Sequence, residues 1–335
     1  MQLNRRCFLR ATAGSAAGLL TGCIGDWRTH TPQSSLRGSF AVDKNRARIF
    51  SSAIRAPLKV MAISDTHLFL DDMRGESFRA YSGRMAKTYN TTRHFKTGAP
   101  TNPKDCFEQA LTLAKAERVD LLTLAGDIFS FPSEAAVEWA CSKLEASGVP
   151  FLYTAGNHDW HYEGLPGTEN ELRARWTAQR LGPLYRGADP LMAVSEIGGV
   201  RFVAIDDSTY EILPKQLKFF REQVVSGKPL VLLMHIPLYA LGRDVNFGCG
   251  HPAWGASSDR YWLIERRPQW PENGHTPTTM AFRREVFAAP NLLGVIAGHT
   301  HTQSLDCIGG IPQLVVEANA CGGYLMVELL SQDEL

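Results

Sequence analysis

The chain has 335 residues, of which 44% are hydrophobic and 21% are charged, and its formal net charge is +1. These values are typical of a globular protein with a sizeable core, and they exclude a disordered chain. The near-neutral charge gives no electrostatic reason for nucleic-acid binding, so we expect no nucleic-acid-binding surface.

The first 22 residues resemble an export signal. "MQLNRRCFLR" is basic, "ATAGSAAGLL" is short and apolar, and "TGC" follows. The pair Arg5-Arg6 resembles a twin-arginine motif, and "LLTGC" resembles a lipobox in which Cys23 is acylated. The alternatives are an ordinary secretory signal and an unmodified thiol. We expect an exported protein, periplasmic or in the cell envelope, that is held on a membrane through a lipid anchor on Cys23.

Residues 23–57 are interpreted as the lipid-anchored tether and lead-in, since residues 24–38 are polar and residues 39–56 are ambiguous. One domain is expected over residues 58–335. Short β-branched or apolar runs bounded by Gly, Pro and Asp predict strands throughout it. These runs are "LKVMAI", "VDLLTLA", "VPFLYTA", "VRFVAI", "PLVLLM", "LLGVIA", "IPQLVVEA" and "YLMVEL".

Helical patterns lie between these runs and indicate an α/β architecture. They are "NPKDCFEQALTLAKAER", "SEAAVEWACSKLEAS", "ENELRARWTAQRL" and "PKQLKFFREQVV". Ser133 is a plausible N-cap of the second, and Pro214 occupies the first position of the fourth. Residues 68–102 and 238–278 do not fit the alternation and are predicted to be long insertions.

Five predicted strands end in a polar cluster. "SDTH" with Asp65 and His67 follows the first, "GD" with Asp127 the second, and "GNHD" with Asn157 and His158 the third. Later strands are followed by "HIP" with His235 and by "GHTH" with His299 and His301. Any one of these could be a turn, but sites in α/β sheets form at the carboxyl ends of strands. A His, Asp and Asn set without Cys suits Zn, Mn or Fe, and seven ligands are about right for two ions.

The ordered pattern "DTH", "GD", "GNHD", "MHIP", "GHTH" resembles that of the calcineurin-like dinuclear metallophosphoesterases over roughly residues 58–330. The resemblance implies a four-layer α/β/β/α sandwich and two divalent or mixed-valence ions. It implies that Asp65, His67 and His301 hold one ion. It implies that Asn157, His235 and His299 hold the other, with Asp127 as the bridge. His158 would be a catalytic, non-ligand histidine beside the substrate phosphate, and Asp159 would steady the loop or orient His158.

Ser130 departs from two branches of this family. It stands where the protein serine/threonine phosphatases have a catalytic Asp and where the purple acid phosphatases have an iron-binding Tyr. What remains is similar to small phosphodiesterases, including those that act on cyclic nucleotides. The resemblance implies hydrolysis of a phosphomonoester or phosphodiester by a hydroxide shared between the ions. The alternative is a non-catalytic lipoprotein that keeps the fold to bind metal or a partner.

The first insertion contains six basic and no acidic residues from Ser77 to Lys104, interleaved with aromatic residues. We interpret it either as a lid that recognises an anionic substrate through residues such as Arg84 and Arg93, or as a solvated loop. Arg266 and Arg267 in the second insertion are weaker candidates for substrate binding.

Overall fold

The structure is a computed structural model that describes residues 35–36, 38–88, 91–245, 247–255 and 274–334. The predicted signal, Cys23, Arg266 and Arg267 lie outside these ranges. Residues 34–335 form one compact unit, which therefore includes much of the segment that the sequence left ambiguous. Within the described ranges, no helix has both the length and the apolar character needed to cross a bilayer.

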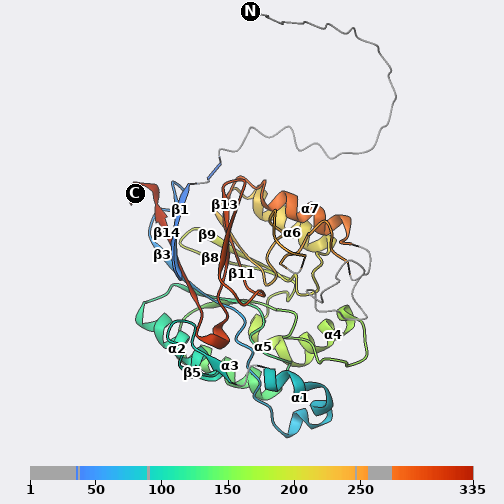
Figure 1. Ribbon diagram of the computed structural model, residues 1–335. Helices are drawn as coiled ribbons and strands as arrows, with labels where there is room; N and C mark the ends of the chain where they lie inside the picture. The colour runs from blue at the N-terminus through green and yellow to red at the C-terminus, as the bar shows by residue number, and fades with distance from the viewer. Residues whose placement is uncertain (1–34, 37, 89–90, 246, 256–273, 335) are drawn as a thin grey trace, which may run out of the picture. The chain divides into compact units, whose positions relative to one another are not determined.

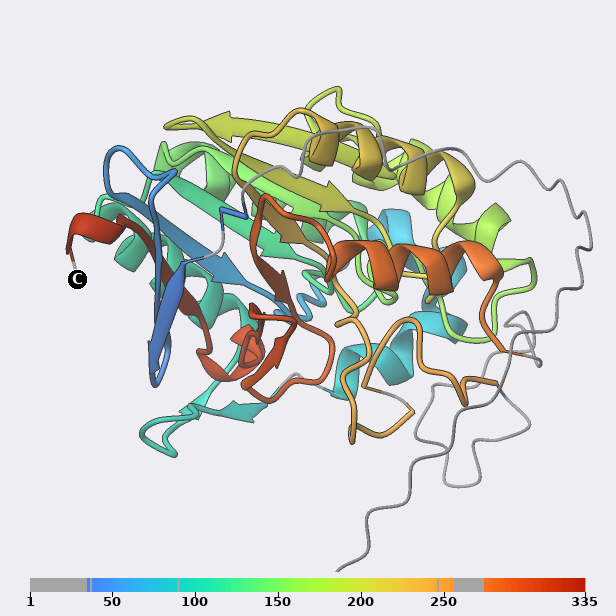
Figure 2. The same ribbon diagram turned by 90° about the horizontal axis from the view of Figure 1, so that it is seen from above.

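Two six-stranded mixed sheets form the centre of the unit (Figures 1 and 2). Sheet 1 has the order β1 (Ser39–Asp43), β2 (Arg46–Ser51), β14 (Leu325–Ser331), β3 (Leu58–Ile63), β6 (Leu121–Ala125), β7 (Phe151–Thr154). Sheet 2 has the order β12 (Ser304–Ile308), β13 (Ile311–Val315), β11 (Leu292–Ala297), β10 (Leu230–Leu233), β9 (Val200–Ile205), β8 (Met192–Ile197). Strands β3, β6 and β7 are mutually parallel, as are β13, β11, β10 and β9.

Helices pack on one side of each sheet. Those associated with sheet 1 are α2 (Pro103–Ala116), α3 (Glu134–Ser147), α4 (Glu169–Trp176) with the π-helical turn η3 (Thr177–Leu181), and α5 (Gly182–Tyr185). Those associated with sheet 2 are α6 (Pro214–Val225) and α7 (Pro277–Val286). In Figure 1 the teal α2 and α3 lie well apart from the gold α6 and orange α7.

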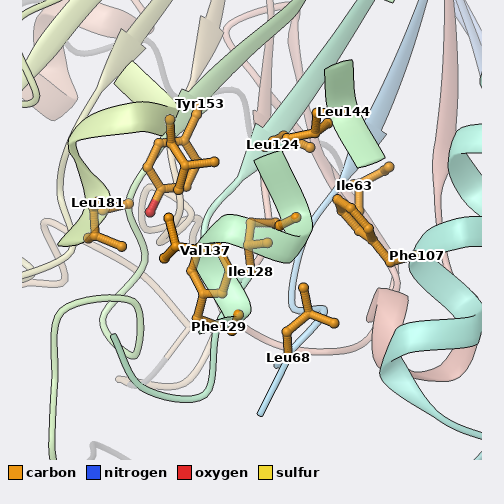
Figure 3. Close-up of a cluster of buried hydrophobic side chains, with 14 of the residues drawn as sticks. Ile63, Leu68, Phe107, Leu124, Ile128, Phe129, Val137, Leu144, Tyr153 and Leu181 are labelled. Carbon is orange, nitrogen blue, oxygen red and sulfur yellow. The ribbon is translucent and has the colours of Figure 1, made fainter. Parts of the chain in front are cut away.

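Three apolar clusters hold these elements together. One joins the helical side of sheet 1 to its helices, and Figure 3 shows Ile63, Leu124 and Tyr153 of this cluster near Phe107 of α2 and Val137 of α3. A second joins sheet 2 to α6 and α7. The third contains residues of both sheets, so the two sheets bury their remaining faces against each other. The α/β architecture predicted from the sequence is confirmed.

All eight predicted strands and all four predicted helices are present, and Ser133 caps α3 through a bond from the Ala136 amide. The segment "ENELRARWTAQRL" begins as α4 but continues as a π-helical turn. The prediction missed the β1–β2 hairpin, the edge strands β8 and β12, and α7. Within the described ranges the cysteines are free thiols.

The first insertion is largely folded. It contains the 3₁₀ helix η2 (Met73–Phe78), α1 (Arg79–Thr88) and a hairpin of β4 (Thr92–Arg93) and β5 (Pro100–Thr101). Phe78 stacks on Tyr162 with ring centroids 5.0 Å apart, and Met85 of α1 is buried. The hairpin binds the 3₁₀ helix η4 (Asn319–Cys321), since the Phe95 amide donates to the Cys321 carbonyl at 2.9 Å. Both the helical part and the hairpin of this insertion are therefore held against the rest of the domain.

Candidate metal centre

The polar clusters predicted at five strand ends meet at one edge of the two sheets. Strands β3, β6 and β7 of sheet 1 and β10 and β11 of sheet 2 lead into them. Because neighbouring parallel strands place their carboxyl ends at the same edge, side chains from distant parts of the chain come together there. The residues form two groups, and within each group the ligand atoms of the acidic and histidine side chains lie within 4.8 Å of one another.

The first group consists of Asp65, His67 and His301. The Nε2 atoms of His67 and His301 are 3.0 Å apart, and His301 Nε2 is 3.3 Å from Asp65 Oδ1. Two imidazole nitrogens and a carboxylate oxygen thus face one small volume. The other Asp65 oxygen accepts bonds from the Ser64 hydroxyl at 2.7 Å and from the His299 amide at 2.9 Å, which fixes the carboxylate plane.

The second group consists of Asp127, His235 and His299, joined by the amide oxygen of Asn157. His235 Nε2 is 3.2 Å from Asp127 Oδ2 and 3.1 Å from Asn157 Oδ1. His299 Nδ1 is also 3.1 Å from Asn157 Oδ1. The structure therefore brings together all seven residues that the sequence analysis assigned as metal ligands.

The hydrogen bonds of His235 orient it as a ligand. Its Nδ1 is 2.8 Å from the carbonyl of Ala125, and a carbonyl only accepts, so Nδ1 carries a proton. In the neutral ring this leaves a lone pair on Nε2, which faces Asp127 and Asn157. Asp207 supports the same loop, because its Oδ1 accepts bonds from the amides of His235 and Ile236 at 3.1 and 3.2 Å. Such outer bonds are usual behind histidine ligands of metals.

The backbone at the site adopts a conformation that side-chain-bearing residues rarely take. Five of the seven predicted ligands have left-handed φ angles, namely Asp65 (54°), His67 (53°), Asp127 (50°), His299 (71°) and His301 (58°). Each such residue costs on the order of 1–3 kcal/mol, and such residues cluster at functional sites. The surrounding packing must over-determine these turns for them to persist.

Two of the motif glycines are required by close approach. A Cβ on Gly156 would lie 2.2 Å from Asp127 Oδ1, and a Cβ on Gly298 would lie 1.6 Å from the Ser64 hydroxyl oxygen. Both distances are far below any normal contact. Gly156 therefore lets two neighbouring loops of sheet 1 touch, and Gly298 lets a loop of sheet 2 touch a loop of sheet 1.

Burial and mutual charge set the protonation of the site. Burial raises the pKa of Asp127, but the surrounding histidines, His235 above all, together hold it well below its usual value. Burial lowers the pKa of His235, but Asp127 raises it to about 10. Burial likewise raises the pKa of Asp65, and His301 brings it below its ordinary value. In the second group a buried carboxylate thus faces an imidazole that is protonated when no ion is bound. A cation there would replace that proton.

The donor set fits two ions. Imidazole nitrogens, carboxylates and an amide oxygen suit Mn, Fe or Zn better than an all-oxygen cage would. Burial and a neighbouring His235 also lower the pKa of His299 to about 3, so this imidazole is neutral and able to bind a metal.

Comparison with known proteins agrees with this geometry. The family model described as calcineurin-like phosphoesterase matches residues 58–303. The chain belongs to the calcineurin-like phosphoesterase family. The resemblance inferred from the motifs is confirmed, and with it a phosphoesterase-type site with two candidate ligand groups.

Individual relatives are distant. A probable cyclic nucleotide phosphodiesterase of Psychrobacter sp. is 24% identical over 214 residues, or 61% of this chain. The match spans 54% of that relative, about half its length. A dimetal phosphatase from Danio rerio shares the fold, with a TM-score of 0.50, 13% identity, and coverage of 80% of this chain and 91% of that one. A purple acid phosphatase from yellow lupin aligns with a TM-score of 0.46 and 12% identity, over 83% of this chain and 46% of that one.

His158 of this phosphoesterase lies beside the ligands. Its ring stands edge-on to that of His67, with centroids 5.0 Å apart, and its amide donates to Asp127 Oδ1 at 2.7 Å. His158 is half-buried as a residue. His158 therefore lies at the boundary between the ligand groups and the surroundings of the site.

Asp159 and Ser130 hold the ligand loops. The carboxylate of Asp159 accepts bonds from the amides of Asp127, Gly156 and Phe129 at 2.7–2.9 Å, which bears out a loop-steadying role. Burial raises its pKa to about 7. The Ser130 hydroxyl donates to the carbonyl of His67 at 3.0 Å. The residue that departs from two related branches thus supports a ligand turn.

Arg84 and Arg93, the two basic residues predicted to bind substrate, have local partners. The Arg84 guanidinium forms an ion pair with Glu163, with Nε 2.8 Å from Oε2. Arg93 donates to the Gly98 carbonyl at 3.0 Å. Two residues at the site were not predicted from the sequence: Asp207, which contacts His235, and Tyr210, which contacts His299. Both lie in "DDSTY", directly after β9, so the polar end of a sixth strand was an available signal.

Proposed function

We propose that this protein is an exported, two-metal phosphodiesterase, with cyclic nucleotides as the substrate class to test first. The observation that carries the proposal is the convergence of two ligand groups at one sheet edge, with the ring of His158 against them. A protein that had kept the fold only for binding would give this imidazole no task.

Each ligand has a distinct task in this proposal. Asp65, His67 and His301 would hold one ion, and Asn157, His235 and His299 the other. Asp127 would lie between them. When bound, the two ions supply positive charge for the phosphate oxygens and a water made acidic enough to attack near neutral pH.

His158 would act on the leaving group. Hydrolysis adds the hydroxyl of water to phosphorus, breaks one P–O bond and places a proton on the departing oxygen. A protonated His158 can supply that proton, because it lies beside the ligand groups and is not enclosed. The bond from its backbone amide to Asp127 ties its position to that of a metal ligand.

Two observations support a diester substrate. The Psychrobacter relative, which matches 61% of this chain, is a probable cyclic nucleotide phosphodiesterase, although the match spans only 54% of that relative. Ser130 occupies the position at which two phosphatase branches carry a catalytic Asp or an iron-binding Tyr, and here it supports the backbone of His67.

The test is a substrate panel with a matched variant. The purified chain loaded with Mn²⁺ is assayed on cyclic nucleotides, bis-nitrophenyl phosphate and nitrophenyl phosphate, and bound metal is measured. We expect diester hydrolysis by the wild type. We expect His158→Ala to retain both ions and to lose activity by about 10²–10⁴-fold. The loss should be smallest for nitrophenyl esters, because nitrophenolate leaves without a proton.

The outcomes separate the parts of the proposal. Hydrolysis of monoesters alone would contradict a diesterase. Equal losses for poor and good leaving groups would place His158 in phosphate binding and not in proton transfer. Two bound ions without any hydrolysis across the panel would favour the non-catalytic alternative.

We also propose a lipid anchor at Cys23 outside the cytoplasm. Its support is the order of "RRCFLR", an apolar run and "LLTGC" ahead of a polar tether. Stable anchoring takes more than one acyl chain, which a lipidated N-terminal Cys provides. Cys23→Ser should move the protein to the soluble fraction or leave an uncleaved precursor. Unchanged fractionation and mass would refute lipidation and leave the enzymatic proposal intact.

A further inference from the structure

Tyr210 lies in the loop after β9 and contacts the metal centre from outside. Its hydroxyl is 2.6 Å from Nε2 of His299. Its ring is buried, with 1% exposure, and its φ angle is 61°, in the left-handed region that bulky residues avoid. A strained, buried tyrosine in contact with a predicted ligand indicates a constraint beyond simple packing.

The bond to Tyr210 fixes the tautomer of His299. The Nδ1 atom of His299 faces Asn157 at 3.1 Å, within the second ligand group. A neutral imidazole carries its proton on one nitrogen only. If Nδ1 is to offer a lone pair to an ion, Nε2 must carry the proton and donate it to the Tyr210 oxygen. The tyrosine thus holds both the orientation of the ring and its metal-binding tautomer.

The second insertion keeps Tyr210 in place. Its ring stacks on Trp254 with centroids 4.3 Å apart and planes inclined by 28°. Trp254 in turn stacks on His275 at 4.9 Å and 19°. His275 Nδ1 is 2.9 Å from the carboxylate of Glu211, the residue that follows Tyr210 in the chain. These contacts therefore lead from Tyr210 through Trp254 and His275 back to the residue next to Tyr210. The Cys249 thiol also donates to the Tyr210 carbonyl at 3.4 Å.

We propose that Tyr210 is a positioning residue for the ion of the second group, and that the second insertion holds it there through Trp254. This inference rests on the proposed two-ion centre. The competing explanation is that the hydroxyl and the imidazole merely satisfy each other in a buried place. That explanation gives the bond no influence on metal affinity.

The experiment compares Mn²⁺ binding by the full chain, Tyr210→Phe and Tyr162→Phe. Tyr162 is a matched control, because it is also buried and its hydroxyl donates to the Pro132 carbonyl, at 3.4 Å, away from the predicted ligands. Calorimetric titration measures the two affinities, and electron paramagnetic resonance distinguishes a coupled Mn pair from isolated Mn. Thermal unfolding of the metal-free proteins checks the fold.

In Tyr210→Phe we expect one Mn²⁺ to bind as in the wild type and the other about 10–100-fold more weakly. At a Mn²⁺ concentration that saturates the wild type, the coupled-pair spectrum should give way to that of isolated Mn. Tyr162→Phe should behave as wild type. Trp254→Ala should weaken the same ion, and Trp254→Phe should weaken it less.

Unchanged affinities in Tyr210→Phe would overturn the inference, and so would equal weakening of both ions, which indicates general loosening. Unchanged affinities in Trp254→Ala would overturn the part assigned to the insertion. If the wild type binds two ions and Tyr210→Phe binds both with the same affinities, this inference is refuted and the proposed function is not. A wild type that binds no pair of ions refutes the proposed function together with it.

Discussion

The two sheets make different contributions to the site. The strand ends of sheet 1 supply both acidic predicted ligands, Asp65 and Asp127, and the amide of Asn157. The strand ends of sheet 2 supply only imidazoles, those of His235, His299 and His301. Each ligand group draws on both sheets, so neither sheet alone can complete an ion site.

Sheet 2 has buried acidic residues of its own, but they bind backbone and helix termini. Asp207 accepts amides of the loop that carries His235. Glu211 accepts bonds from His275, Thr276 and Thr279 at the start of α7. Negative charge for the predicted ions is therefore concentrated on one side of the site. The other side supplies imidazoles, and residues behind them hold two of these in place: Asp207 the loop of His235, and Tyr210 the ring of His299.

The largest effect should come from removing charge on the sheet 1 side. Asp127→Asn should abolish activity and lower bound metal, because the variant loses a carboxylate beside both groups. Metal content and turnover are the measurements. Asp306→Asn is the control, since Asp306 lies on β12 of sheet 2 and pairs with Arg243. Full metal occupancy with wild-type turnover in Asp127→Asn would contradict the two-metal proposal.

A smaller effect should follow from a substitution that pushes the sheet 2 loop at Gly298 away from the sheet 1 loop at Ser64. Gly298→Ala places a methyl group 1.6 Å from the Ser64 oxygen and 2.7 Å from Asp65 Oδ2. We expect a loss of about 3 kcal/mol in the free energy of unfolding, as for other overpacked sites, and weaker metal binding. Denaturant unfolding measures the loss.

Gly83→Ala is the control for that variant. Gly83 lies in α1, and a Cβ there meets no atom within 4 Å. This substitution should leave stability unchanged or raise it by up to about 1 kcal/mol, because alanine favours the helix. Equal losses in both variants would mean that the close approach at Gly298 is unimportant.

The strand ends were predictable because each buried strand is a short apolar run that ends abruptly in polar turn residues. The missed edge strands alternate between partly buried and exposed residues, which weakens that signal. A signal was nevertheless present: Gly198-Gly199 and Gly309-Gly310 each link an edge strand to its neighbour. All four glycines have positive φ, as two-residue hairpin turns require.

The contact of Tyr210 with His299 could not be predicted. It depends on a left-handed turn at a bulky residue and on a stack with Trp254, which is 44 positions later in the chain. The pairing of Arg84 with Glu163 joins residues that are even farther apart in the chain, by 79 positions. From composition alone, the basic residues of the first insertion were expected to be available to a substrate. Composition cannot show that a residue far away in the sequence, such as Glu163, is already paired with one of them.

The role of Glu211 can be tested by acid titration of stability. Burial raises its pKa, but the bonds from His275 and from Thr279 outweigh this and bring it below its ordinary value. Its contribution is therefore present above about pH 4.5 and is lost as the pH falls through the lowered pKa. Glu211→Gln should cost about 2 kcal/mol at neutral pH and flatten the acid side of the stability profile. If the free energy of unfolding falls with pH in the same way in Glu211→Gln as in the wild type, the assigned role of Glu211 is wrong.

The smallest effect should come from the first insertion, which leaves sheet 1 after Asp65 and His67. If it recognises substrate, as the sequence suggests, Arg84→Glu and Arg93→Glu should raise KM for a charged substrate by a few-fold and leave metal content unchanged. A small activated ester should be hydrolysed as before. Because Arg84 pairs with Glu163, Glu163→Gln is the informative control. Equal losses on both substrates, or none, would make the insertion structural.

The position of β14 has a consequence for the order of events during synthesis. This strand lies between β2 and β3, pairing with residues 46–51 and 58–62 although it spans residues 325–331. A growing polypeptide therefore cannot close the sheet behind Asp65 until Leu325–Ser331 has left the ribosome. Contacts between such distant segments form late and slowly. If the proposed two-metal centre exists, a nascent chain should therefore bind its ion pair only after this last strand is in place.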